Sequence, residues 1–158
     1  MKKLLLLSFL ILTSHYVATG QVISGETIIL VESVIDSKGT QNDLHEKVTN
    51  WFGKSFKSAK NVITSDTQSA IAGTYINGYI FGGAHQVNWS HTIQVDIKDD
   101  KVRLRIWLVD NNPVYYFFNK KGQQRGMYKK GLAKLVADSK ALEVNFQDFL
   151  INSINDDW

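Results

Sequence analysis

The spacing of apolar residues changes its period twice in the first third of the chain. Residues 27–35, TIILVESVI, are mostly β-branched and apolar, which predicts a strand. A turn at Asp36–Gly39 follows, and Thr40 with Asp43 three residues later suits the start of a helix. The helix itself is predicted from apolar residues at three- and four-residue steps, namely Leu44, Val48, Trp51, Phe52 and Phe56. His45 falls on the opposite face, which we expect to be solvated.

Residues 89–98 and 101–109 predict a β-hairpin. Both segments alternate apolar and polar residues, and the two-residue turn Asp99-Asp100 between them sets one register. That register pairs the apolar residues with one another on one face and places Asp96 opposite Arg103 on the other. The expected apolar pairs are Ile97 with Val102, Val95 with Leu104, and Ile93 with Ile106. Trp51 and Leu44 should be buried against this apolar face.

The remaining elements complete a fold class. Asn61–Thr64 and Ser69–Ile80 predict two further strands, and Val114–Phe118 predicts either an edge strand or a packed loop. Apolar spacing in residues 127–155 predicts one long helix, or two short helices with a break near Ser139–Glu143. The order is strand, helix, four strands, helix. This order predicts an α+β two-layer sandwich, with an antiparallel sheet that carries helices on one face.

These elements resemble a known family. The residues that carry the resemblance are the strand at 27–35, Leu44 and Trp51 on the helix, the strand Asn61–Ile63, and the hairpin from Trp89 to Trp107. Over residues 27–109 the chain resembles domain-of-unknown-function family 4468, secreted bacterial proteins with a TATA-binding-protein-like fold. The resemblance implies that fold. It implies no catalytic or binding residue, because the family has no established activity, and a fold name does not imply DNA binding.

The first twenty residues have the order of a secretory signal peptide. Lys2 and Lys3 precede the apolar run from Leu4 to Leu12, and small residues end the segment. We therefore expect cleavage after Gly20, a single mature domain at residues 21–158, and a periplasmic or secreted location with no transmembrane segment after cleavage. The whole chain has 18 basic and 15 acidic residues, so removal of the two lysines leaves 16 against 15, a net charge of +1. The chain has no cysteine, so its core must hold it without disulfides.

Two parts of the sequence are candidates for a functional site. Gly78–His91, GYIFGGAHQVNWSH, holds two histidines and a Gly-Gly pair, but it lacks a phosphate-loop motif and nearby acidic ligands. We interpret it as a connection between two strands, and expect no metal and no cofactor. The other candidate is basic, and basic groups near aromatic rings suit polyanions. Its residues could form one binding surface: Arg103, Arg105, Trp107, Lys120, Lys121, Arg125, Lys129 and Lys130.

Enzyme signatures are weak. There is no cysteine nucleophile and no serine in a Gly-x-Ser-x-Gly elbow, and the pairs Asp99-Asp100 and Asp156-Asp157 fall in a turn and a tail. The sequence therefore favours a secreted, non-enzymatic binding or assembly module, with an envelope-associated hydrolase as the alternative. The expected partner is a protein or an envelope polymer. A polyanion is a candidate ligand, and nucleic acid is not expected.

Overall fold

The computed structural model describes residues 22–24, 27–81, 85–109 and 116–152. The predicted signal segment therefore lies outside the described residues. The strands are β1 (Val22–Ser24), β2 (Thr27–Asp36), β3 (Ile63–Thr67), β4 (Ala70–Phe81), β5 (His85–Lys98) and β6 (Lys101–Leu108). The helices are α1 (Gln41–Ser55), α2 (Ala59–Val62) and α4 (Lys129–Asn152), with a short 3₁₀ helix, η1, at Gly126–Tyr128.

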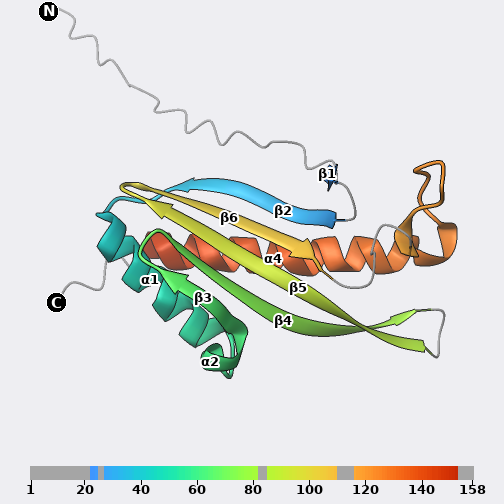
Figure 1. Cartoon of the computed structure of the whole chain (residues 1–158), viewed down its shortest axis with the longest axis horizontal. Helices are drawn as coiled ribbons and strands as arrows, with labels where there is room; N and C mark the ends of the chain where they lie inside the picture. Colours follow the sequence, from blue (N-terminus) through green and yellow to red (C-terminus); the bar gives the residue numbers. More distant parts are fainter. Residues whose placement is uncertain (1–21, 25–26, 82–84, 110–115, 153–158) are drawn as a thin grey trace, which may run out of the picture.

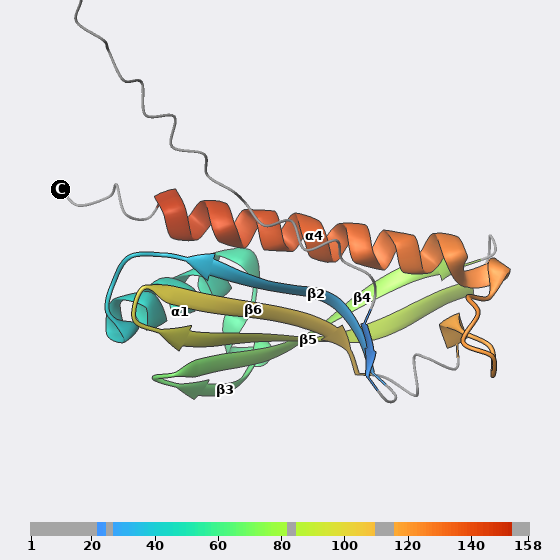
Figure 2. The same cartoon turned by 90° about the horizontal axis from the view of Figure 1, so that it is seen from above.

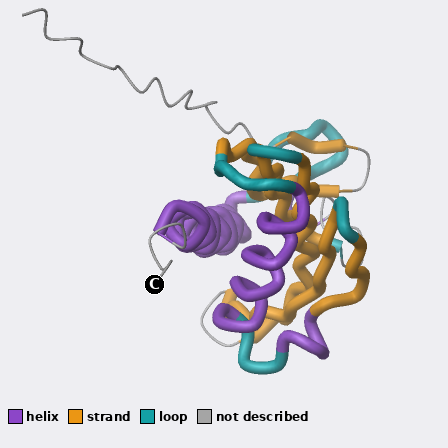
Figure 3. Tube along the Cα trace, turned by 90° about the vertical axis from the view of Figure 1, so that its left-hand side faces the viewer, coloured by secondary structure: helices purple, strands orange, loops and turns teal. Residues whose placement is uncertain are grey.

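The strands form one antiparallel sheet in the order β1-β2-β6-β5-β4-β3. The helices α1 and α4 cover one face of it, and α4 runs along the length of the sheet (Figures 1 and 2). Figure 3 shows both helices on the same side of the strands. The predicted α+β two-layer sandwich is therefore confirmed. Two details were not predicted: β1 lies at one edge of the sheet, and the short helix α2 takes the first half of the predicted strand Asn61–Thr64, whose second half begins β3.

The β5–β6 hairpin has the predicted register. Ile97 pairs with Val102, Val95 with Leu104, and Ile93 with Ile106. These six side chains face the helices and are almost completely buried. Alternate residues face solvent on the uncovered face, where Asp96 lies opposite Arg103. We call this uncovered side the outer face and the helix-covered side the inner face.

Helix α1 begins as the sequence predicts. The Thr40 hydroxyl accepts a hydrogen bond from the Asp43 backbone N–H, and the Asp43 carboxylate accepts one from the Thr40 N–H in return. This bonding lowers the pKa of Asp43, chiefly through the Thr40 side chain. Leu44, Val48, Trp51 and Phe52 are buried.

Trp51 of α1 packs against α4. Its ring lies 4.7 Å from that of Phe146, and its Nε1–H donates to Asn145 Oδ1 at 2.9 Å. The predicted burial of Trp51 is confirmed, and these contacts show that it also joins the two helices. The prediction for His45 was wrong, because its Nε2 lies 2.6 Å from Asp66 Oδ1 of β3 and the side chain is largely covered.

The C-terminal pattern forms one continuous helix, α4, so there is no break near Ser139–Glu143. Its buried residues include Leu132, Leu135, Phe146 and Leu150. Ahead of it, Phe117 and Phe118 are buried, and Phe118 forms an isolated bridge with Gln124. The described part of Val114–Phe118 is therefore a packed segment. None of the helices among the described residues is both long and apolar enough to cross a membrane.

Candidate functional site

A groove opens beside β4, between the end of α1 and the middle of α4. It has a volume of about 510 Å³ and is lined by Ser55, Phe56, Lys57, Tyr75, Ile76, Asn77, Asp138 and Leu142. These residues come from three separate parts of the sequence. We call it the Tyr75 groove, because Tyr75 lies at its centre between the aromatic and polar groups described below.

One side of the Tyr75 groove is aromatic. The Tyr75 ring lies 5.5 Å from that of Phe56 and stacks on His91 of β5 at 4.7 Å, with 17° between the ring planes. His91 is fully buried, and its Nδ1 lies 3.1 Å from the Trp89 carbonyl oxygen. Because a carbonyl oxygen can only accept, Nδ1 carries the proton in this contact. The buried imidazole thus supports the Tyr75 ring from behind, while Phe56 and Tyr75 themselves line the groove.

The other side of the groove is polar and internally bonded. The Asn77 amide donates to the Tyr79 hydroxyl at 3.2 Å, and that hydroxyl donates to Asp138 Oδ2 at 3.1 Å. Lys134, one turn earlier on α4, donates to both Asp138 oxygens at 3.1 and 2.9 Å. Its ammonium group also lies 5.6 Å from the centre of the Tyr79 ring. Asn77, Tyr79, Asp138 and Lys134 therefore form one chain of hydrogen bonds across the β4–α4 junction.

The two tyrosines keep their protons at neutral pH. Burial raises the pKa of Tyr79 to about 12, and the negative charge of Asp138 acts in the same direction. Burial also raises the pKa of Tyr75 strongly, and the Ser139 hydroxyl offsets only part of that rise. A neutral phenol is a hydrogen-bond donor and a poor base. The groove thus offers aromatic surface and the polar groups of Tyr75, Asn77 and Asp138 to a ligand, while the Tyr79 hydroxyl stays bonded to Asp138.

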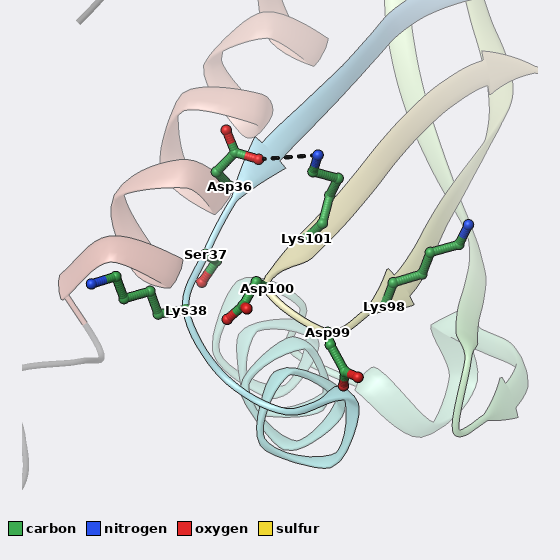
Figure 4. Close-up of a pocket in the computed structure, with 7 residues that line it drawn as sticks. All are labelled: Asp36, Ser37, Lys38, Lys98, Asp99, Asp100 and Lys101. Atoms are coloured by element: carbon green, nitrogen blue, oxygen red, sulfur yellow. Dashed lines mark ion pairs between the residues drawn. The ribbon is translucent and has the colours of Figure 1, made fainter.

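A second hollow, of about 670 Å³, lies at the β5–β6 turn (Figure 4). It is formed by the loop before α1 and the β5–β6 turn, and is lined by Asp36, Ser37, Lys38, Lys98, Asp99, Asp100 and Lys101. The two turn aspartates are bonded to backbone groups here. Asp99 Oδ1 accepts from the Gln41 N–H at 2.7 Å, and Asp100 Oδ1 accepts from the Gly39 N–H at 3.0 Å.

This second hollow is a structural junction. The N–H groups at a helix start lack partners within the helix, so the Asp99 carboxylate supplies one for α1 and meets its positive end. Asp100 adopts a left-handed conformation, with φ of 58°, which Asp tolerates better than most residues. The prediction that the aspartate pair lies in a turn is confirmed. The sequence did not indicate that Asp99 of this turn accepts a hydrogen bond from the start of α1.

The sequence-predicted residues of β6 lie on the outer face. Arg103 donates to Asp96 Oδ2 through Nε at 2.8 Å and Nη2 at 2.5 Å, and Arg105 Nη2 reaches the same oxygen at 3.3 Å. Burial alone would raise the pKa of Asp96, but hydrogen bonds from Gln94 and Arg103 and the two arginine charges together lower it. Arg105 also lies 5.9 Å from the Trp107 ring. The positive charge of this pair is therefore partly neutralised by Asp96.

The other predicted basic residues lie elsewhere. Phe117 packs on Trp89 at 5.0 Å, and Trp89 is buried on the inner face, so the chain after residue 116 lies on the helix side. There the five predicted basic residues occupy a turn, a short linking segment and the start of α4: Lys120, Lys121, Arg125, Lys129 and Lys130. Arg103, Arg105 and Trp107 lie on β6, so the two predicted groups are carried by different elements.

The histidines do not form a metal site in the described part of the chain. No group of three or more His, Cys, Asp or Glu side chains there could hold a metal ion. His45 pairs with Asp66, and His91 is buried beside Tyr75. The segment Gly78–His91 consists mainly of the facing ends of β4 and β5, which pair up to Phe81 and His85. The expected connection is therefore shorter than the sequence predicts, because His85–Asn88 belong to β5, and its remaining residues, Gly82–Ala84, lie outside the described residues.

Solved structures identify the fold. A TBP-like protein from Parabacteroides distasonis ATCC 8503 is similar with a TM-score of 0.63 at 8% sequence identity, over 84% of this chain and 97% of that one. The chain has a TATA-binding-protein-like fold. At this identity the similarity establishes the fold and no activity. A DUF4468 family protein from Bacteroides ovatus ATCC 8483 is similar with a TM-score of 0.49 at 16% identity, over 85% of this chain and 88% of that one.

The TBP-like fold expected from the sequence resemblance is thus confirmed. The sequence matches no family model and no curated protein.

Proposed function

We propose that this protein is an exported, non-enzymatic binding or assembly module, and that the Tyr75 groove receives its partner. The observation that carries the proposal is the meeting of a stacked aromatic wall with a chain of hydrogen bonds in one open groove. Its volume of about 510 Å³ falls within the range of about 300–1,000 Å³ typical of ligand sites. Export is proposed from the signal-like residues 1–20.

The chemistry of the groove supports binding better than hydrolysis. A hydrolase needs a nucleophile or a base that can take a proton at working pH. The raised pKa values of Tyr75 and Tyr79 keep both phenols protonated, and Asp138 is engaged by Tyr79 and Lys134. These groups suit hydrogen bonding to a ligand, as in other apolar sites that contain a few convergent polar groups. This favours the binding module over the envelope-associated hydrolase.

The partner that we propose is a protein segment or an envelope polymer. The basic residues near the start of α4 would add affinity for a polyanionic polymer, because Lys129 and Lys130 stand at the positive end of the helix with no acidic residue in its first turn. Such a contribution would weaken as salt rises, whereas hydrogen bonding and stacking in the Tyr75 groove would weaken less.

Site-specific photocrosslinking in cells that export the protein tests this proposal. A photoreactive residue replaces Lys57 at the groove rim or, as the control, exposed Glu46 on α1. We expect an adduct with another cell component from position 57, none from position 46, and loss of the adduct when Asn77→Ala and Tyr75→Phe are combined with the probe. Equal adducts from both positions, or no adduct from position 57, would contradict the proposal.

A further inference from the structure

The strand β4 has one edge that is only partly used. On one side, β5 pairs with it along its whole length, from Ala70 to Phe81. On the other side, β3 pairs only with residues 70–73, so within the described residues the edge from 74 to 81 has no strand partner. Figure 1 shows β4 continuing far beyond the end of β3. An unpaired edge presents a row of N–H and C=O groups that another strand can join.

This edge lacks the features that usually prevent such pairing. Edge strands are commonly protected by charged side chains, proline or a bulge. All 18 Lys and Arg and all 15 Asp and Glu residues lie outside residues 67–95, and the single proline is Pro113. The β4–β5 register runs without a shift, so β4 is regular over its whole length.

The other end of the sheet is a useful contrast. Strand β2 pairs with β1 only over Thr27–Ile29, so it too has an open stretch. That stretch carries Glu32 and Asp36, has a register shift between Ile29 and Val31, and contacts α4. The protections missing from β4 are therefore present on β2, within the same sheet.

We propose that β4 pairs with β4 of a second copy of this chain, antiparallel and around a two-fold axis, so that one sheet continues through both subunits. An uncharged strand can face itself without repulsion between like charges. Because the edge becomes free only after Gly73, a symmetrical pairing is centred near residue 77. With Asn77 on the axis, Tyr75 lies beside Tyr79 of the second copy on the inner face.

The same register suits the outer face. Ile76 is 67% exposed in the single chain, and it falls beside Gly78 of the second copy. The Gln86 and Asn88 side chains lie over Gly78, because a Cβ there would be 2.5 Å from Gln86 Nε2 and 2.8 Å from Asn88 Oδ1, so Ile76 would pack against these two side chains. Pairing therefore covers an exposed apolar side chain. This inference rests on the backbone edge of β4 and not on the ligand of the Tyr75 groove, but the two share Tyr75, Ile76 and Asn77, so a paired second copy would border the groove.

Mass in solution tests the proposal. The exported chain, measured by light scattering after size exclusion, should have twice the mass of one chain. Ile76→Lys places two like charges at the paired edge and should give the mass of one chain. Val34→Lys is the matched control, because Val34 is 59% exposed on the outer face of β2, and it should keep the doubled mass. A far-UV circular dichroism spectrum of Ile76→Lys that matches the parent, with a single cooperative urea transition, would show that the lysine separates the subunits without unfolding them.

A cysteine provides a second, independent measurement. The chain has no cysteine of its own, so Asn77→Cys introduces the only thiol. On the two-fold axis it meets its own copy, and mild oxidation should join two chains, whereas Val34→Cys should stay unjoined. A parent protein with the mass of one chain would overturn the proposal. That result would do so even if the edge of β4 instead bound a strand of another protein. A doubled mass that persists in Ile76→Lys would overturn it as well. Neither result would alter the crosslinking expected from Lys57.

Discussion

The two halves of strand β5 bury very different side chains on the same face of the sheet. In the second half, Ile93, Val95 and Ile97 face aliphatic partners on β6, and all are at most 1% exposed. In the first half, Trp89 and His91 are equally well buried, but their partners on β4 are polar or aromatic: Tyr75 and Asn77. The sheet geometry is continuous, so the difference lies in side-chain chemistry alone.

This difference separates stability from recognition. Aliphatic side chains need no directional partner, so the second half of β5 gains stability simply from close packing. Buried polar groups need hydrogen bonds, and beside the first half β4 and α4 form such bonds in the Asn77–Tyr79–Asp138–Lys134 chain. Such an arrangement adds little stability, but it holds its groups in fixed orientations, as the ligand site proposed above would require. We therefore expect mutations in the two halves to have different effects.

The largest effect is expected in the aliphatic half. Leu104 of β6 is fully buried opposite Val95. Leu104→Ala should lower the free energy of unfolding by about 2–5 kcal/mol, because it removes apolar contacts and leaves a cavity. In the groove half, Tyr75→Phe keeps the ring and should cost only about 0.5–1.5 kcal/mol. Urea titrations of both variants measure the free energy of unfolding. An equal decrease in the two variants would contradict the distinction between the two halves.

An intermediate effect is expected at the turn that joins β5 to β6. Asp99→Ala removes the acceptor for the Gln41 N–H at the start of α1, so it should cost about 0.5–2 kcal/mol. Lys98→Ala, one residue earlier and exposed, should change stability by less than about 0.5 kcal/mol. A helix signal in circular dichroism that melts at the same urea concentration in both variants would show that Asp99 does not support α1.

The smallest effect near neutral pH belongs to the Tyr79 phenol, and it grows in alkali. The pKa of Tyr79 is about 12 in the folded protein, above its ordinary value of 10, so the folded state holds this proton more tightly than the unfolded state. Its contribution to stability is therefore complete below pH 10 and is lost as the pH rises from 10 to 12. Tyr79→Phe should lose stability less steeply over this range. Urea titrations at several alkaline pH values would contradict this if the two proteins declined in parallel.

Much of the fold could be predicted because its signals are local. The β5–β6 register follows from two alternating segments and a two-residue turn, and α1 follows from its apolar spacing and the Thr40–Asp43 pair. The continuous course of α4 could not be decided, because its apolar spacing between Ser139 and Glu143 allows either a break or a helix. Only packing against the sheet and α1 selects the single helix.

The groove could not be predicted because its signals are not local. Tyr75 and Tyr79 look like ordinary strand residues, and nothing in the sequence connects them with Asp138 on a helix about sixty residues later. The proximity of His45 to Asp66 is equally hidden, since it depends on β3 lying beside α1. Whether the predicted basic residues share one surface could not be judged from the sequence for a similar reason. Charge was visible in the sequence, but the side of the sheet on which each segment lies was not.

The bond from Asp99 to the start of α1 has a consequence for the order of folding. The two residues it joins are 58 positions apart, so this contact cannot form until the hairpin that carries Asp99 has closed its turn. Helix α1 has its own local start in the Thr40–Asp43 pair, and the hairpin has its own register, so each can form transiently alone. Docking of the turn onto the helix then links two early units over a long stretch of chain, and such long-range closure is the slow kind of event in small proteins. We therefore expect Asp99 to influence the rate at which the domain folds, in addition to its final stability.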